Sequence, residues 1–532
     1  MSFPLDTVSV GIHWTRLTSI VEEVATVLLK TSFTPVVREA GDLSAGIFDR
    51  RGRMIVQAVT GTPGHINTMA TAVRHFAERF PLDSLEPGDT LAGNDPWLTS
   101  GHLHDVTMVT PLFHEDRAVG WAANTCHMAD IGGRTLGAEA LDLHEEGLRI
   151  PILKLFHRGL MDPVVEALIA ANVRVPEMVL GDLQAMASAN HRAEHRLAAF
   201  FADSGPADLE ALSDEIGARS ERALRERIAA LPNGSSSGDV TLDGFDEPIT
   251  LRATITVTGD TLTVDYAGTS PQVREGINVV LNYTHAYTTY PLACVLSPDI
   301  PHNHGSFRPI AVTAPRGSVL NPDYPAPVAA RHIVGHFLPA AVFAALHGFC
   351  PDRVPAESNC GLWASHFEGA RPEGGRFVFT LFSNGGMGAR AGADGLSVTS
   401  FPSGVQNIPA EIVESTTPLL VHERALREGS GGAGAWRGGL GQRLTLSVRG
   451  PGAVHSCIYE RVRHPARGLA GGGSGSPGRV VLDDDTEPHP KRKYFLAGGR
   501  RVTLELPGGG GYGPPAERTD ELRERDEREG YL

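Results

Sequence analysis

The chain has 532 residues, too many for one simple core, so its length predicts two to four domains. Its 62 acidic residues outnumber 47 basic ones, and the net charge of −15 opposes non-specific binding to nucleic acid or to an anionic membrane. The composition, 41% hydrophobic and 20% charged with 61 glycines, is that of a soluble globular protein with many turns.

Hydropathy and cysteine usage predict neither a membrane segment nor a secreted protein. No apolar run approaches the length that crosses a bilayer, and the opening stretch, residues 1–6, lacks a basic segment followed by an apolar core. The five cysteines are scattered without a Cys-x-x-Cys pair, so neither a disulfide framework nor a thiolate zinc site is indicated. We therefore expect a cytoplasmic protein.

The lysines argue against a phosphate-binding loop of the Gly-Lys-Ser/Thr type. That loop needs a lysine directly after a glycine to hold the phosphates. The chain contains only Lys30, Lys154, Lys491 and Lys493, and none of them follows a glycine. If the activity uses ATP, we expect another chain to bind it.

The N-terminal region predicts helices around short hairpins. Apolar residues recur with helical spacing between residues 17 and 30, which predicts an amphipathic helix. Residues 36–49 and 54–59 have a hairpin pattern with Asp42 at its entrance. On spacing alone Asp42, which follows a glycine, is a turn residue. A second helix is predicted over residues 62–80.

The stretch from Gly93 to Gly133 carries the strongest signal. It contains two apolar runs, 106–113 and 118–123, which are joined by the polar residues 114–117. This pattern predicts an antiparallel hairpin. The residues just before the first strand and just after the second would then meet at one end of the hairpin.

Two His-x-x-Asp motifs flank this hairpin and predict a metal site. His102 and Asp105 precede it, and His127 and Asp130 follow it. Imidazole and carboxylate ligands together suit a divalent ion such as Zn, Mn or Fe(II). His104 lies inside the first motif, and the spacing does not decide whether it is a ligand. The alternative is that these residues are turn and cap residues, because a single His-x-x-Asp motif is common at turns.

The sequence pattern changes from helical to β-rich near residue 232. Residues 162–231 read as helices with charged faces, on which His191 and His195 are more readily surface residues than metal ligands. The Gly- and Ser-rich stretch 232–238 is the best domain boundary. We therefore divide the chain into 1–232, which carries the metal, and a β-rich half, 239–515.

Further elements are predicted within and after that half. Residues 249–257 and 262–266 form a hairpin pattern, and apolar helices are predicted near 283–295 and 334–346. Glycine clusters between residues 384 and 513 are interpreted as tight turns, and the charged residues 516–532 as a solvated or disordered tail.

Several ordered motifs resemble the hydantoinase B family over nearly the whole chain. They are Arg38-Glu39 to Phe48, Asn94-Asp95-Pro96, His102-x-x-Asp105, His127-x-x-Asp130-Ile-Gly-Gly, residues 146–151, Asn303-x-Gly305-x-x-Arg308-Pro309, and residues 430–439. That family comprises B subunits of ATP-dependent N-methylhydantoinases and caprolactamase, the matching part of 5-oxoprolinases, and related subunits of acetone and acetophenone carboxylases.

The resemblance implies a division of labour between two subunits. A hydantoinase A-like ATPase subunit phosphorylates the substrate, and the B-type subunit holds one divalent metal ion where the activated intermediate reacts. The metal ligands implied by the family motifs are Asp42, His102, Asp105 and His127, which leaves Asp130 as a fifth ligand or a carboxylate beside the ligand set.

The chain departs from the family pattern near this implied site. Ala40 and Ala45 replace an Arg and a Cys that the family often has, and residues 63–69 differ from its usual Pro-Val-His-Leu-Gly-Ser-Met. These departures affect the prediction of the substrate more than the prediction of the metal site.

These observations predict an α+β fold with a metal-bearing N-terminal half and a β-rich, Gly-punctuated C-terminal half. The function they favour is that of a B subunit in a hetero-oligomeric ATP-dependent cyclic-amide hydrolase, with Asp105 or Asp130 as general base. Two alternatives stay open: a subunit of an ATP-dependent acetone- or acetophenone-type carboxylase, and a non-catalytic scaffold for an A-type ATPase.

Overall fold

The computed structural model describes residues 6–59, 62–203 and 209–532. The N-terminal half is built on a seven-stranded sheet with strand order β2-β1-β5-β4-β3-β6-β7, and every neighbouring pair is antiparallel. The strands are β1 (Leu43–Phe48), β2 (Met54–Gln57), β3 (Thr90–Gly93), β4 (Asp105–His114), β5 (Arg117–His127), β6 (Leu153–His157) and β7 (Leu160–Met161).

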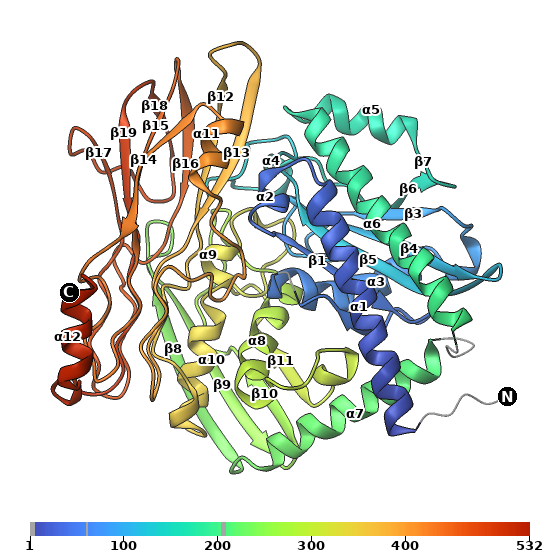
Figure 1. Ribbon diagram of the computed structural model, residues 1–532, viewed down its shortest axis with the longest axis horizontal. Helices are drawn as coiled ribbons and strands as arrows, with labels where there is room; N and C mark the ends of the chain where they lie inside the picture. Colours follow the sequence, from blue (N-terminus) through green and yellow to red (C-terminus); the bar gives the residue numbers. More distant parts are fainter. Residues whose placement is uncertain (1–5, 60–61, 204–208) are drawn as a thin grey trace.

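Helices cover this sheet and give the N-terminal half its α+β character (Figure 1). The long α1 contains the predicted amphipathic helix, and the side chain of its N-cap residue Asp6 accepts hydrogen bonds from the backbone N–H groups of Val8 and Ser9. The helices are α1 (Thr7–Thr31), α2 (Pro35–Arg38), α3 (Pro63–Arg79), η1 (Leu82–Ser84), α4 (Leu143–Glu146), α5 (Pro163–Asn172), α6 (Pro176–Ala202) and α7 (Glu210–Ala229).

The middle of the chain forms a four-stranded sheet, β11-β10-β9-β8, with helices packed against it. The Gly- and Ser-rich stretch that was predicted to be a break lies mostly in β8, where the exposed Ser235 and Ser237 pair through their hydroxyls with Thr residues of β9. The elements are β8 (Gly234–Leu242), β9 (Ile249–Thr258), β10 (Thr261–Asp265), α8 (Leu281–Leu296), η2 (His304–Phe307), β11 (Ile310–Thr313), α9 (His332–Gly335), α10 (Leu338–Leu346) and η3 (Pro351–Arg353).

Two further four-stranded sheets, β13-β12-β16-β18 and β14-β15-β19-β17, make up the C-terminal region, drawn in orange and red in Figure 1. The elements are β12 (Trp363–Ala370), β13 (Arg376–Ser383), α11 (Ala410–Thr416), β14 (Leu419–Leu426), β15 (Gln442–Val448), β16 (Gly452–Ile458), β17 (Arg479–Leu482), β18 (Lys493–Ala497), β19 (Arg501–Glu505), η4 (Pro515–Glu517) and α12 (Asp520–Arg528).

The glycine clusters of this region are not mainly tight turns. Gly438, Gly439 and Gly509 lie in backbone segments that run against one another, joined by hydrogen bonds such as Gly509 N–H to the Gly439 carbonyl. A Cβ on Gly438 would lie 2.0 Å from the Gly509 carbonyl oxygen, and one on Gly509 would lie 2.1 Å from that of Met387. Close backbone approach is therefore what requires glycine here.

The charged end of the chain is also more ordered than predicted. Residues 520–528 form α12, and Asp526 on this helix is buried. Arg518 lies 2.6 Å from Asp526 and 2.9 Å from Asp394, which ties the end of the chain to the glycine-rich body. Arg518, Arg525 and Asp526 are thus held in ion pairs, whereas most of the other charged residues of α12 are exposed to solvent.

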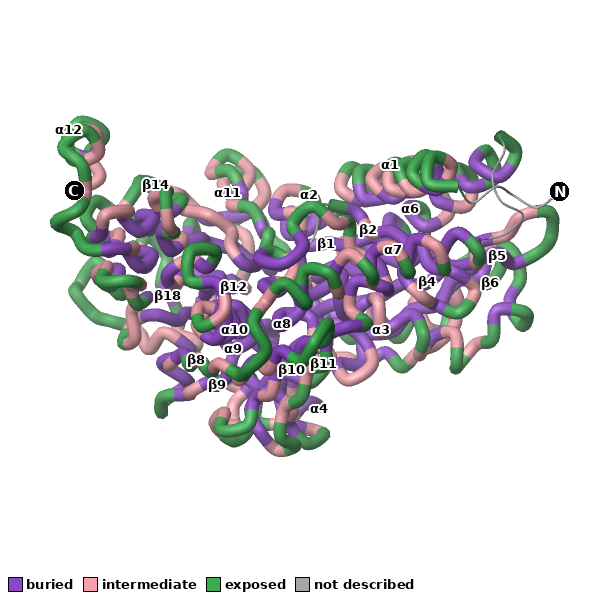
Figure 2. The backbone as a smooth tube through the Cα atoms, turned by 90° about the horizontal axis from the view of Figure 1, so that it is seen from below, coloured by how far each residue is buried: buried purple, intermediate pink, exposed green. Residues whose placement is uncertain are grey.

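Burial is continuous through the body of the molecule, with exposed residues concentrated at its margins and on α12 (Figure 2). One large hydrophobic cluster contains residues from α1, the N-terminal sheet, the middle sheet and the C-terminal strands. Within the described residues, no helix is both long and apolar enough to cross a membrane.

Candidate metal centre

The predicted hairpin is present and positions the metal-ligand residues. β4 pairs with β5 so that Asp105 lies directly opposite His127. β1 pairs with the other edge of β5, and the backbone carbonyl of Asp42 accepts a hydrogen bond from the N–H of His127. His102 belongs to the turn that leads into β4. The sheet register thus brings four dispersed residues to one end of three strands.

His102, Asp105 and His127 form a group in which one ligand atom from each lies within 4.8 Å of the others. The Oδ1 atom of Asp105 lies 2.7 Å from Nε2 of His102 and 3.0 Å from Nδ1 of His127. All three side chains are buried. Two imidazoles and a carboxylate are ligands typical of Zn, Mn or Fe(II) sites.

The orientation of His102 fits a metal ligand. Its Nδ1 donates a hydrogen bond to the Ala329 carbonyl at 2.8 Å, which presents the lone pair of Nε2 toward Asp105. Among the described residues this buried Nε2 has no hydrogen-bond partner, although Asp105 Oδ1 is 2.7 Å away. Two lone pairs that face each other at this distance repel unless a cation lies between them. The site therefore fits a divalent ion.

Asp42 lies in the same cavity but outside the group of three. Its Oδ1 is 3.6 Å from Nε2 of His65, and the same nitrogen lies 2.8 Å from Oδ2 of Asp105. His65 sits in the first turn of α3, where its N–H bonds to the side chain of the N-cap residue Thr62. His65 thus bridges the two carboxylates.

Arg331 supplies a buried positive charge to the site. Its Nη2 lies 2.5 Å from Oδ2 of Asp105, and its Nε donates to the Ser100 carbonyl at 2.8 Å. The guanidinium stacks over the Tyr283 ring at 4.2 Å from the centroid, a favourable cation–π contact. A Cβ on Gly101 would lie 2.9 Å from this side chain, so the glycine makes room for it.

The charges around Asp105 set the ionisation of the group. Burial by itself would raise the pKa of Asp105, but the neighbouring His102, His65 and Arg331 outweigh burial and hold that pKa well below its ordinary value. Burial, followed by the charge of Arg331, lowers the pKa of His102 to about 4. An ionised Asp105 beside a neutral His102 is the protonation state that a metal requires.

The pKa values of the two residues beside this pair are shifted upward. Burial raises the pKa of Asp42, with the His65 charge acting in the opposite direction. For His65, burial lowers the pKa, but Asp105 and Asp42 outweigh burial and the net shift is upward. The 3.6 Å between Asp42 Oδ1 and His65 Nε2 is longer than a hydrogen bond, so the two residues interact through their charges.

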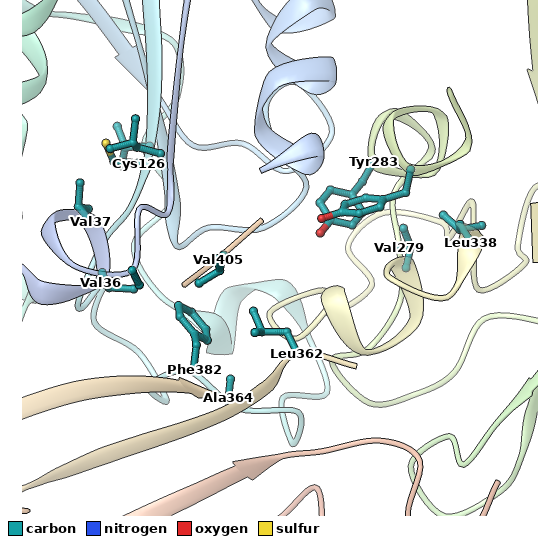
Figure 3. Packing of buried hydrophobic residues seen from close by; sticks show 14 of the residues in the cluster. Val36, Val37, Cys126, Val279, Tyr283, Leu338, Leu362, Ala364, Phe382 and Val405 are labelled. Carbon is teal, nitrogen blue, oxygen red and sulfur yellow. The ribbon is translucent and has the colours of Figure 1, made fainter. Parts of the chain in front are cut away.

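The cavity at this centre is small and its walls come from both halves of the chain. It has a volume of about 40 Å³. Figure 3 shows Phe382, Val405 and Leu362 gathered on one side and Tyr283 on the other. The N-terminal half provides the ligand residues, whereas residues after position 280 close the site over them.

Asp130 lies apart from the group. Its oxygens accept hydrogen bonds from the N–H of Gly132 at 3.0 Å, from Nη1 of Arg174 at 2.9 Å and from the Arg174 backbone N–H. His104 is buried and its ring stacks on that of His127 at 5.6 Å, outside the group of three. His191 is partly exposed and lies 3.5 Å from Glu194, as a surface residue would.

A buried glutamate supports the ligand set from behind. Oε1 of Glu146 accepts hydrogen bonds from the N–H groups of Val328 and Ala329 at 2.5 and 2.7 Å. The Ala329 carbonyl in turn accepts from His102, and Arg331 follows two residues later. Glu146 thus holds the loop that orients both His102 and Arg331.

The family model described as Hydantoinase B/oxoprolinase matches residues 6–515. The chain belongs to this family. It is similar to a putative D-/L-hydantoinase B subunit of Pseudomonas sp. (strain NS671), with 29% identity over 556 residues that cover 99% of this chain and 93% of that protein. The resemblance predicted from the sequence motifs is therefore confirmed.

Two solved structures share the fold of this family member. The ATP-dependent caprolactamase of Pseudomonas jessenii has a TM-score of 0.91 and 27% identity, over 99% of this chain and 94% of that chain. Acetone carboxylase has a TM-score of 0.88 at 18% identity, over 99% and 78% of the two chains, which shows the common fold alone. The predicted mixture of helices and sheets is confirmed.

Three residues of the centre were not predicted to belong to it, although one of them, Glu146, begins the family motif 146–151. His65 stands at a helix start where it reads as a capping-region residue, although Pro63-Gly64-His65 belongs to a stretch compared with the family. Arg331 and Glu146 reach the site through contacts between residues more than 180 positions apart, for which spacing gives no signal.

Proposed function

We propose that this chain is the metal-bearing B-type subunit of an ATP-dependent cyclic-amide hydrolase. The observation that carries the proposal is the buried His102, Asp105 and His127 group, in which the Nε2 atoms of both histidines have no hydrogen-bond partner among the described residues. The relatives named as a hydantoinase B subunit and an ATP-dependent caprolactamase support the reaction class. The substrate would be a cyclic amide whose carbonyl oxygen has been phosphorylated.

We assign the metal to His102, Asp105 and His127, with Asp42 completing the set. A divalent ion bound there would lower the pKa of a bound water or polarise the activated amide carbon. The protein residues provide the surroundings for this chemistry. Glu146 and the Ala329 carbonyl fix the orientation of His102, and Arg331 keeps Asp105 ionised.

Two polar groups of the chain are placed to handle protons and developing charge. His65 lies between the Asp42 and Asp105 carboxylates and can hold a proton close to the cavity. Arg331 is a buried cation beside the cavity, where negative charge on a reacting oxygen is stabilised in a low-dielectric environment. Of the two carboxylates predicted as general base, Asp105 lines the cavity but is held by His65, Arg331 and the ligand histidines, and Asp130 lies outside the cavity with three donors on its oxygens, so neither is free to take a proton in this conformation.

The partner in this proposal is a hydantoinase A-like ATPase. Similar proteins are named as the B or beta component of their enzymes, which indicates a multi-subunit assembly. The absence of Gly-Lys-Ser/Thr in this sequence supports placing ATP on the other component.

The test is reconstitution of this chain with a hydantoinase A-like ATPase. We expect the complex, and neither chain alone, to hydrolyse ATP in the presence of one or more hydantoins or lactams and to open the ring in proportion. Stoichiometric ring opening that disappears on metal removal and returns with Zn, Mn or Fe(II) would support the proposal. Incorporation of labelled bicarbonate into product, without ring opening, would contradict it.

A further inference from the structure

A second cavity, of about 300 Å³, lies next to the metal cavity. Sites for small organic ligands begin at about this volume, whereas the 40 Å³ at the metal centre has room for only a few waters. A cyclic amide therefore fits the larger cavity and not the smaller one in this conformation. We call the larger one the receiving chamber.

The receiving chamber and the metal cavity share a wall. Cys360 lines the chamber and Leu362 lines the metal cavity, two positions along the same segment. Phe401 and Ser403 repeat this arrangement in a second segment. Two strips of chain therefore separate the two spaces.

The first of these strips is held in an unfavourable conformation. Cys360 is buried and has φ of +55°, a region that residues with a Cβ rarely adopt. The side chain of Asn359 fixes this bend by donating to the Gly361 carbonyl at 2.7 Å. Such strain persists only where the surroundings impose it, so the wall is a built part of the structure.

The chamber lining combines an apolar wall with a polar edge. The apolar side chains are Ala340, Phe343, Ala344, Pro355, Ala356, Phe401 and Leu469. At the edge, Nε of Arg467 lies 2.6 Å from Oε1 of Glu357, and its Nη1 lies 3.5 Å from Asp239. The guanidinium is thus already paired with carboxylates, which leaves little attraction for an anion.

We propose that the receiving chamber binds an uncharged, compact cyclic amide, the form of the substrate that precedes phosphorylation. The apolar wall would cover the ring methylenes, and the Ser and carboxylate groups at the edge would accept or donate hydrogen bonds to the amide. This inference rests on the proposed function, since the bound ring is the form that the partner ATPase would phosphorylate before the metal centre acts on it.

Two serines on β8 provide a matched pair of variants. Ser237 lines the chamber, whereas Ser235 does not. Both are exposed, and each hydroxyl pairs with a Thr hydroxyl of β9, at 2.9 Å for Ser237 and 2.8 Å for Ser235. Ser237→Trp would therefore fill the chamber mouth, and Ser235→Trp would place the same side chain on the same strand outside it.

The experiment measures binding of caprolactam and hydantoin to the purified full chain by ligand-observed NMR and calorimetry. Ring-opened 6-aminohexanoate and inorganic phosphate serve as charged comparisons. We expect the neutral rings to bind the wild type and Ser235→Trp within twofold of each other, and Ser237→Trp at least tenfold more weakly. Phe401→Ala, which removes apolar wall, should weaken ring binding several-fold without changing metal content.

The inference is overturned if neither ring binds, if the two Trp variants bind the rings equally, or if only the charged comparisons compete at this site. Failure of the proposed function would look different. It would appear as missing metal-dependent turnover in the reconstituted complex for wild type and Ser235→Trp alike, while the ring-binding measurements on the isolated chain would be unaffected.

Discussion

The hairpin that carries the metal-ligand residues and the glycine-rich C-terminal region are built by different means. In the hairpin, Asp105 and His127 are 22 positions apart and meet because two adjacent strands pair in register. In the glycine-rich region, Met387, Gly439 and Gly509 are far apart in the sequence and meet through direct backbone packing. Local pairing places the reactive side chains, and long-range backbone packing shapes what surrounds them.

Removing both imidazoles of the ligand group should have the largest effect on metal binding. We expect His102→Ala combined with His127→Ala to lower metal affinity by more than about 100-fold, since changing one supporting residue of a metal site already costs about 10–100-fold. Elemental analysis of the dialysed protein and metal titration would measure this loss. The surface pair His191→Ala and His195→Ala is the matched control and should keep its metal.

Asp105→Asn tests the carboxylate at the centre of the charge network. Asn keeps the shape of the side chain but removes the charge that Arg331 and His65 face, so both metal affinity and folding stability should fall. Leaving a buried cation without its partner costs about 3–5 kcal/mol. Metal titration and denaturant unfolding of the metal-free protein would separate the two losses.

Asp130→Asn provides the contrast within the same pair of motifs. Asn keeps an oxygen for the Gly132 and Arg174 N–H groups, so we expect this variant to retain metal content while losing part of the ion pair with Arg174. Equal metal loss in the Asp105 and Asp130 variants would contradict the assignment of the ligand group.

In the glycine-rich region the backbone segments pack too closely to accept a side chain. Gly438→Ala would place a Cβ 2.0 Å from the Gly509 carbonyl, so it should destabilise the fold by about 3 kcal/mol, at the upper end of overpacking effects. Gly11→Ala in α1 meets nothing within 4 Å and should stabilise by up to about 1 kcal/mol. Denaturant unfolding of both variants would measure these changes. A Gly438→Ala variant as stable as the wild type would contradict close backbone packing as the reason for this glycine.

The sequence predicted those parts of the centre that depend on nearby residues. The hairpin and the convergence of His102, Asp105 and His127 followed from two apolar runs joined by a polar turn and from motif spacing, and Asp42 followed from the family resemblance. The positions of Arg331, Glu146 and the walls depend on contacts across more than 180 residues. The α12 helix was missed because ion pairs with Arg518 and Asp394 offset charges that, read alone, predict a solvated tail.

Glu146 offers a smaller and more specific test of how the two halves are joined. Burial raises the pKa of Glu146 to about 8, an effect that the N–H groups of Ala329 and Val328 only partly offset. Asp142 raises this pKa further and Arg331 lowers it. The small space beside Glu146 is also lined by other charged groups, namely Arg134, Glu139 and Lys493.

The sign of the pH effect follows from that shift. Between an unfolded pKa near 4.5 and a folded pKa of about 8, the unfolded chain releases the Glu146 proton while the folded protein keeps it. Stability contributed by protonated Glu146 is therefore fully present below pH 4.5 and declines as the pH rises toward 8. Glu146→Gln keeps the acceptor oxygen for Val328 and Ala329 but cannot ionise, so the stability difference between variant and wild type should grow in favour of the variant across this range. Unfolding free energies measured at several pH values would check this, and a difference that stays constant from about pH 5 to about pH 8 would mean that Glu146 is ionised in the folded protein.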